Sequence, residues 1–317
     1  MNIHPMLRDK RPIIPTRQIE ALGDAIKLTI QDGHLGLQVQ GRARDGKSRA
    51  CMYLIEHPRW IENFAMLPKV TLERRTNLSD NGFYQIIQKK LGLMQPNRVS
   101  ASQRIGQIAD RIIAECMVRD CTSAIMFVDE AQWMSESDYE YLTNIGNNLD
   151  DAGFRLVCIF INQTDDSKAR KKLRKSKELP EVYPPHLVGR YFMANHTFTG
   201  LQSSADIHHA LDQYDRRLKY DDKTFTEYFA PQAFASGWRM SSHANDIVMA
   251  IKKVRKDAGF IGSGDLPMKV FDTMVYRLLV RTAAETANFE SFDQKMIINA
   301  IAEPYIQLEQ TRYRQAT

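Results

Sequence analysis

Four residues near the N-terminus, spaced as Gly-x-x-x-x-Gly-Lys-Ser, could hold a phosphate group. Glycines let a loop turn its backbone N–H groups towards phosphate oxygens, a lysine ammonium neutralises the β- and γ-phosphates, and a serine hydroxyl is a ligand for Mg²⁺. A charged surface loop could also fit this pattern by accident, so the surrounding elements have to decide. The four residues, in the stretch QGRARDGKSRA, are Gly41, Gly46, Lys47 and Ser48.

A second motif supplies the acids that such a site needs. The run IMFVDE, residues 125–130, is apolar and ends in Asp129 and Glu130. An Asp at a strand end holds Mg²⁺ in phosphate-loop proteins, and a Glu beside it can polarise the attacking water. Both motifs together predict ATP and Mg²⁺ as ligands, with Ser48 and Asp129 on the metal. The nucleotide-binding loop is predicted to comprise Gly41, Arg42, Ala43, Arg44, Asp45, Gly46, Lys47, Ser48 and Arg49.

The elements around both motifs have the order that a phosphate-binding loop requires. The first motif lies between an expected strand at 34–40 and a helix at 48–57, and the second ends a strand. Strands alternating with helices predict an α/β fold, a parallel sheet with helices on both faces. The other expected strands are 69–76, 154–163 and 196–201, and the other expected helices are 82–93, 100–120 and 138–151.

The strand signal ends near residue 201, and helical patterns follow. Helices are expected at 205–218, 241–256, 268–286 and 294–310, with Pro304 kinking or breaking the last. Two domains are therefore predicted. Residues 1–200 would form an N-terminal linker with the nucleotide-binding domain, and residues 201–317 a helical lid with C-terminal helices and tail.

Composition limits the location and the partners. The formal net charge of +5 permits nucleic-acid binding without requiring it. The four cysteines form no C-x-x-C pair, which is typical of reduced, mostly buried thiols in a cytosolic protein. The N-terminus has no apolar segment of a signal peptide, and no run is long enough to span a membrane. A cytoplasmic protein with no membrane partner is expected.

With both motifs in place, the sequence resembles the AAA+ ATPases. Gly41–Ser48 looks like Walker A, and 125–130 like Walker B. The resemblance implies further catalytic residues besides Glu130. The end of CIFINQ resembles sensor 1, with Asn162 as first choice and Gln163 as second. LVGRY places Arg190 where the family carries its arginine finger, and Arg239 in SGWRMSSHAND is similar to the sensor 2 arginine.

Within AAA+, the sequence is most similar to the TniB/TnsC group of transposition ATPases, with phage MuB more distant. The resemblance covers roughly residues 10–260. It rests on the preamble HPMLRDKRPIIPTRQIEAL, the loop GRARDGKS, the Walker B end VDEAQ and the short lid. It implies a regulator that assembles on double-stranded DNA as an ATP-dependent ring or filament of its own copies. Such a regulator connects a target-selection protein to a transposase, and hydrolysis resets the assembly.

Two basic sets are candidates for DNA contact. The run KARKKLRKSK, residues 168–177, could follow phosphates or could be a solvated loop. The second set follows the family layout, in which such segments face the interior of the assembly. No helix-turn-helix or zinc finger is evident, so salt-sensitive binding without base reading is expected. The candidates are Lys171, Lys172, Arg174 and Lys175 in the run, and Arg74, Arg75, Arg98 and Arg104 in the interior set.

Two other functions remain open from the sequence. One is a helicase-loader or replication-initiator type of AAA+ ATPase, which also binds DNA but serves a different client. The other is a nucleotide-switched signalling ATPase that binds no DNA. DNA-dependent ATPase activity would separate this last function from the other two.

Overall fold

The computed structural model describes residues 3–74, 79–95, 98–164, 183–260 and 264–316, which form two compact units. A sheet unit contains residues 21–42 and 47–198. A helical unit contains Met1–Glu20, Ala43–Gly46 and Thr199–Thr317. The boundary at 198/199 lies beside the predicted one at 200. The first twenty residues and the tip of the glycine loop, however, group with the helical unit and not with the sheet.

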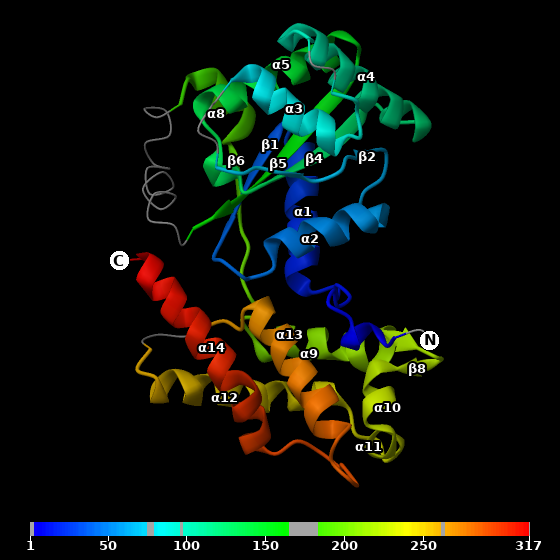
Figure 1. The fold of residues 1–317 in the computed structure, drawn as a ribbon, viewed down its shortest axis with the longest axis vertical. Coiled ribbons are helices and arrows are strands. Elements are labelled where there is room, and N and C mark those ends of the chain that lie inside the picture. Colours follow the sequence, from blue (N-terminus) through cyan, green and yellow to red (C-terminus); the bar gives the residue numbers. More distant parts are fainter. Residues whose placement is uncertain (1–2, 75–78, 96–97, 165–182, 261–263, 317) are drawn as a thin grey trace. The chain divides into compact units, whose positions relative to one another are not determined.

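The sheet unit is built on a parallel sheet (Figure 1). In the described residues the strand order is β2-β4-β5-β1-β6, and β3 also pairs with β4. All of these pairs are parallel. The strands are β1 (Gly36–Gly41), β2 (Ala65–Met66), β3 (Val70–Thr71), β4 (Ser123–Asp129), β5 (Arg155–Gln163) and β6 (Ala194–Thr197). The α/β phosphate-loop fold predicted from the sequence is confirmed.

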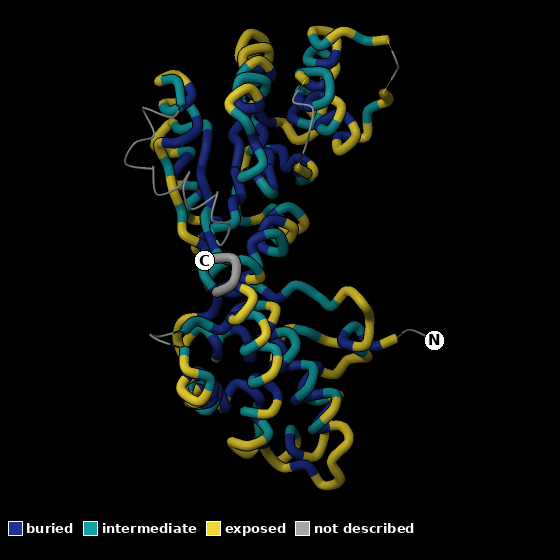
Figure 2. The backbone as a smooth tube through the Cα atoms, turned by 60° about the vertical axis from the view of Figure 1, so that its left-hand side comes forward, coloured by how far each residue is buried: buried dark blue, intermediate teal, exposed yellow. Residues whose placement is uncertain are grey.

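Apolar side chains on alternate strand positions bury both faces of this sheet. Ala124, Met126 and Val128 of β4 share one cluster with side chains of four helices, α3, α4, α5 and α8. The intervening residues of β4 are buried on the opposite face. The central strands and the inner sides of the helices are accordingly the buried parts of the tube in Figure 2. The helices are α1 (Arg17–Gln31), α2 (Lys47–Glu56), α3 (Asp80–Lys90), α4 (Ala101–Val118), α5 (Glu136–Asp151) and α8 (Pro185–Tyr191).

Local signals fix where the helices begin. Ser100 caps α4 in a capping box with Gln103. Ser135 and Asp138 form the same arrangement at the start of α5. These caps satisfy backbone N–H groups that would otherwise have no acceptor in the first turn.

The helical unit has its own apolar core, centred on Ile251, Phe271, Leu278 and Ile301. Short π-helical segments continue α9 and α13 at Gln213–Arg217 and Arg277–Ala283. Its helices are α9 (Ser204–Asp212), α10 (Phe225–Phe229), α11 (Pro231–Ala235), α12 (Ala244–Asp257), α13 (Met268–Tyr276) and α14 (Gln294–Ala316). None of the helices in the described residues has the length and apolar character needed to cross a membrane.

The structure corrects two expectations for this unit. Of the two outcomes expected for Pro304, a break is wrong, because Pro304 lies inside α14, which continues to Ala316; buried Ile301 and Tyr305 on either side pack the helix onto the core. A short hairpin, β7 (Lys219–Tyr220) and β8 (Lys223–Thr224), also occurs where no strand was expected. Its turn residues Asp221 and Asp222 both have positive φ, at 53° and 61°, as a tight hairpin turn requires.

Candidate nucleotide site

The glycine loop joins the end of β1 to the start of α2, which is the arrangement that a phosphate loop needs. Gly41 has no room for a side chain, since a Cβ there would lie 2.3 Å from the carbonyl oxygen of Phe198. Gly46 has a φ of 107°, a conformation that residues with a side chain rarely adopt. Both glycines are therefore required by the backbone itself.

Lys47 lies at the first position of α2 and is 8% exposed. Its ammonium group donates to the carbonyl oxygens of Gly41 and Arg42, both at 2.7 Å. The N-terminus of α2 adds the positive end of the helix dipole, and Ser48 lies in its first turn. A glycine-permitted turn, a buried ammonium and a helix N-terminus together suit a polyphosphate.

Asp129 is the last residue of β4 and is 4% exposed. Alternation along the paired strands places its side chain on the same face of the sheet as the side chain of Gln163. This is also the face of α2. The pKa of the Cys51 thiol on α2 is raised, mainly by burial and then by the charge of Asp129, while the charge of Lys47 acts in the opposite direction. Asp129 therefore lies within electrostatic reach of the first two turns of α2.

Lys69 is a part of the site that the sequence analysis missed. Its ammonium lies 2.5 Å from Oδ2 of Asp129, and the two side chains are 17% and 6% exposed. The contact arises because β3 pairs with the end of β4, with Thr71 opposite Asp129. In this structure the ammonium of Lys69 thus neutralises the charge of Asp129, the carboxylate that was predicted to bind Mg²⁺.

Glu130 follows β4 with a φ of 60°, which is unusual for a residue with a side chain. The amide of Gln132 donates to Oε2 of Glu130 at 2.5 Å, and Oε1 of Gln132 accepts from the backbone N–H of Gln163 at 3.1 Å. Gln132 therefore links Glu130 to the end of β5. The stretch VDEAQ contains Gln132, but nothing in the sequence indicates this bridge.

The two candidates for sensor 1 point to opposite faces of the sheet. Asn162 is 6% exposed, and its amide donates to Oε1 of Gln38 at 2.9 Å and to the carbonyl of Phe160. Gln163 shares its face with Asp129 and is only partly buried. Strand alternation thus turns Gln163 towards the acid, and Asn162 away from it.

Arg190 lies at the end of α8 and is held against α5. Its guanidinium donates to Oδ1 of Asn147 at 3.0 Å and to the carbonyl of Thr143 at 3.4 Å, and it lies 3.8 Å from Oδ2 of Asp150. The side chain is 23% exposed, so part of it still faces solvent.

Arg239, the predicted sensor 2 residue, belongs to the helical unit. Its guanidinium donates to the carbonyls of Phe234 and Trp238 at 2.9 and 2.7 Å and stacks 3.6 Å from the centre of the Phe234 ring. These contacts hold the side chain against the segment that precedes α12.

The tip of the glycine loop is attached to the helical unit. Asp45 is 1% exposed, and its Oδ1 lies 2.6 Å from Nη2 of Arg312 on α14. The same nitrogen donates to the carbonyl of Ala43, and the backbone N–H of Lys269 donates to the carbonyl of Arg44 at 3.3 Å. Arg312 was not among the predicted site residues, since nothing in the sequence relates it to the loop.

The structure separates the predicted DNA contacts into three groups. Arg74 and Arg98 are exposed, and Arg74 lies 5.8 Å from the centre of the Trp133 ring. Arg104 is 1% exposed and donates to Asn81 and Gln88 at 2.7 and 2.6 Å, so we leave it out of the proposed DNA-binding set. The remaining candidates lie outside the described residues: Arg75, Lys171, Lys172, Arg174 and Lys175.

Comparisons with known proteins give only distant likenesses. No protein-family model matches the sequence, and no curated protein matches it. Among solved structures, the ORC2 protein of Aeropyrum pernix in ADPNP–ADP complexes is similar with 13% identity and a TM-score of 0.43, over 97% of this chain and 80% of that one. Cdc6p of Pyrobaculum aerophilum has 14% identity and a TM-score of 0.43, over 98% and 89%. PCH-2 of C. elegans has 13% identity and a TM-score of 0.39, over 93% and 68%. Likenesses this distant do not assign a function.

Proposed function

We propose that this protein is an ATPase of the AAA+ type. The observation that carries the proposal is the placement of Lys47, Asp129 and Glu130 at the carboxyl ends of β1 and β4, with the end of β5 between them. Parallel α/β sheets bind their ligands at this edge. The loop geometry at Gly41 and Gly46 supports the same assignment.

Each residue has a role that follows from its chemistry. Lys47 and the backbone of the loop bind the phosphates, and Ser48 and Asp129 are hard oxygen ligands for Mg²⁺. The bound metal would neutralise charge on the phosphate oxygens. Glu130, oriented by Gln132, accepts a proton from the attacking water. Lys69 balances Asp129 while no metal is bound.

We further propose that the ATPase acts on double-stranded DNA as an assembly of its own copies, in the regulation of transposition. This finer proposal rests on the resemblance to the TniB/TnsC group. The positive net charge and the exposed Arg74 and Arg98 support the DNA part of it. In the assembly Arg190 would reach a neighbouring copy's nucleotide, Arg239 and Gln163 would respond to the phosphates, and the partners would be a transposase and a target-selection protein.

Removing the Lys47 ammonium tests the nucleotide site. We expect Lys47→Ala to abolish tight binding of ATP, because no other side chain of the loop supplies a buried cation to the β- and γ-phosphates. Titration with fluorescent ATP measures this. Lys27→Ala, which removes an exposed lysine on α1, is the matched control and should bind ATP as the wild type does. Equal affinities of wild type and Lys47→Ala would remove the Walker A assignment.

A further inference from the structure

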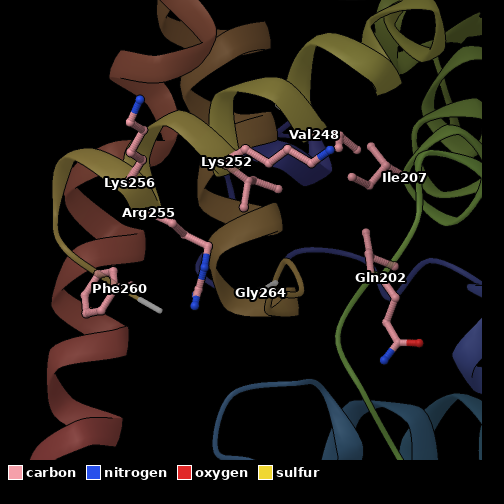
Figure 3. A pocket seen from close by; sticks show the side chains of 10 residues that line it. Gln202, Ile207, Val248, Lys252, Arg255, Lys256, Phe260 and Gly264 are labelled. Carbon is pink, nitrogen blue, oxygen red and sulfur yellow. The ribbon is translucent and has the colours of Figure 1, made fainter. Parts of the chain in front are cut away.

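Lys69 differs from most lysines of the described residues because its side chain is mostly buried. It is 17% exposed, whereas the side chain of Lys27 is 41% exposed. Even Lys252 and Lys256, which line a pocket of about 340 Å³ in the helical unit, are exposed (Figure 3). A lysine is seldom buried unless an acid pairs with it. The burial of Lys69 therefore points to a specific role for its ion pair with Asp129.

Two buried leucines hold Lys69 beside the end of β4. The backbone N–H groups of Leu67 and Leu72 donate to carbonyl oxygens of β4, those of Ile125 and Asp129, at 3.0 Å. The chain on both sides of Lys69 is thus fixed against the same strand, first through β2 and then through β3. Since Lys69 lies between these two short strands, its ammonium is held at the carboxylate that ends β4.

Both carboxylate oxygens of Asp129 accept hydrogen bonds. Oδ1 accepts from the backbone N–H of Glu130 at 3.1 Å, and Oδ2 lies 2.5 Å from Nζ of Lys69. Only 6% of the Asp129 side chain is exposed, so water neutralises its charge poorly and a cation has to do so. Mg²⁺ also prefers carboxylate oxygens, and it repels an ammonium. The ammonium of Lys69 and the metal therefore compete for Asp129.

A buried thiol on α2 shows that this ion pair lies beside the proposed phosphate site. Cys51 is 0% exposed and lies one turn after Lys47, the first residue of α2. Burial raises the pKa of its thiol most and the charge of Asp129 raises it further, while the charges of Lys69 and Lys47 lower it. Three charges thus act on one sulfur atom. Lys69 and Asp129 are therefore within electrostatic reach of the helix start that is proposed to bind phosphates.

We propose that Lys69 is a positioning residue that neutralises Asp129 until Mg²⁺ replaces it, so that the site accepts ATP even without the metal. The proposal rests on the proposed function, since it concerns the same phosphate site. Without Lys69, ATP would meet the bare charge of Asp129, and only the metal could neutralise that charge. Lys69 therefore sets how strongly the binding of ATP depends on Mg²⁺.

The first test compares ATP binding in EDTA with ATP binding in excess Mg²⁺. Lys69→Met removes the ammonium and keeps an unbranched side chain. It should weaken the binding of fluorescent ATP in EDTA about tenfold, because Asp129 is then an uncompensated charge beside the phosphates. In Mg²⁺ the affinity should stay within about threefold of wild type, since the metal supplies the positive charge. Both titrations measure bound nucleotide, so neither depends on turnover.

Lys27→Met is the matched control, because it makes the same substitution in the same unit. It breaks an ion pair of 3.2 Å with Asp24, in which the two side chains are 41% and 74% exposed. Water screens a pair this exposed, so its loss should change the ATP affinity neither in EDTA nor in Mg²⁺.

The second test removes the acid as well. Asp129→Asn in the Lys69→Met background should restore the ATP affinity in EDTA to within about threefold of wild type, because no uncompensated carboxylate is left. Asp129→Asn alone should bind ATP in EDTA at least as tightly as wild type, since it leaves the ammonium of Lys69 in place. If Lys69 only stabilised the fold, Lys69→Met would weaken ATP binding equally in EDTA and in Mg²⁺, and Asp129→Asn would not rescue it.

The outcomes separate this inference from the proposed function. If the wild type binds no ATP even in Mg²⁺, the proposed function fails. If the wild type binds ATP in Mg²⁺ but not in EDTA, or if folded Lys69→Met matches the wild type in both, only the role of Lys69 is overturned. If Lys69→Met does not fold, Asp129→Asn alone decides, and a loss of ATP affinity in EDTA there would overturn the proposal.

Discussion

At the residue scale, Glu130 is the group on which hydrolysis should depend. Its carboxylate is oriented by Gln132, and Asp129 remains available for the metal when Glu130 is changed. Glu130→Gln should therefore keep ATP affinity and lower turnover by about a hundredfold or more, which is the usual loss for a general base. Phosphate release measured beside a nucleotide titration checks both parts. Turnover at the wild-type rate would mean that another residue activates the water.

The two neighbouring amides of β5 should respond differently to truncation. Asn162→Ala removes the hydrogen bond that the Asn162 amide donates to Oε1 of buried Gln38, and should reduce the free energy of unfolding by about 1–3 kcal/mol. Gln163→Ala should leave stability nearly unchanged, because its backbone N–H still reaches Gln132, but should slow ATP hydrolysis. Urea denaturation and phosphate release give the two readouts. If Asn162→Ala slowed hydrolysis and Gln163→Ala did not, Asn162, the first choice from the sequence, would be the sensor residue instead.

Local spacing in the sequence indicated some candidate residues of this site, and long-range contacts brought others to it that no spacing indicates. Gly41, Gly46 and Lys47 form one continuous motif, and the structure shows why the loop needs both glycines. Lys69 and Arg312 reach the site from 60 and 267 positions away, through contacts that only the folded chain creates. Arg104 shows that the sequence can also indicate a residue that the fold makes inaccessible. The family layout suggested that Arg104 contacts DNA, but its buried guanidinium donates to the side-chain amides of Asn81 and Gln88 on α3.

At the scale of the elements, His4 near the start of the chain should make the stability of the fold decrease at acidic pH. His4 packs against Tyr220, Phe225, Tyr228 and Phe229, and its Nδ1 accepts from the backbone N–H of Met6 at 3.1 Å. Burial, and then the charge of Arg8, lowers its pKa from 6.5 to about 4. The folded state therefore binds fewer protons than the unfolded state between these values. Neutral His4 therefore contributes fully to the free energy of unfolding above pH 6.5, and this contribution is lost as the pH falls towards 4.

Replacing His4 isolates this effect. His4→Asn keeps an acceptor for the start of the 3₁₀ turn Pro5–Leu7 but cannot titrate. The variant should be less stable than wild type at pH 7, because it loses the ring contacts, and should lose less further stability between pH 7 and pH 5. Urea denaturation at the two pH values measures the difference. Equal losses in both proteins would show that His4 does not titrate in this range.

The long elements were predictable because burial leaves a pattern in the sequence. The apolar runs of β4 and β5 and the periodic apolar positions of α4 and α12 all appear close to the expected places. The shortest elements differ from the expectation for a physical reason. β2 was not expected, and β3 covers only two residues of the strand expected at 69–76. Each has two residues and is a strand because it pairs with β4. Pro304 does not break α14, because tertiary packing of the helix outweighs the one backbone hydrogen bond that a proline removes.

At the scale of the whole molecule, the chain forms two units, and three separate segments of the sequence make up the helical one. The attachment of Ala43–Gly46 to the helical unit depends on contacts with α13 and α14, more than 200 positions further along. No sequence pattern encodes a contact of that range. These contacts explain why residues 43–46 group with the helical unit.

The proposed DNA binding requires basic residues from separate segments of the chain. Neutralising Arg74, Arg75 and Arg98 should weaken binding to all sequences alike and flatten its dependence on salt, since phosphate contacts carry no base information. Neutralising Lys171, Lys172, Arg174 and Lys175 tests the competing set. We expect the larger effect from the first set.

The central claim is that ATP controls the binding of this protein to DNA. The most direct measurement is the affinity for a DNA duplex over a range of salt concentrations, with ATP and again with ADP. We expect tight binding with ATP, falling on a log–log plot by about 0.9 for each neutralised phosphate, and much weaker binding with ADP or in Lys47→Ala. Binding that ignores both salt and nucleotide, or no binding to DNA at all, would contradict the claim and leave an ATPase without a DNA partner.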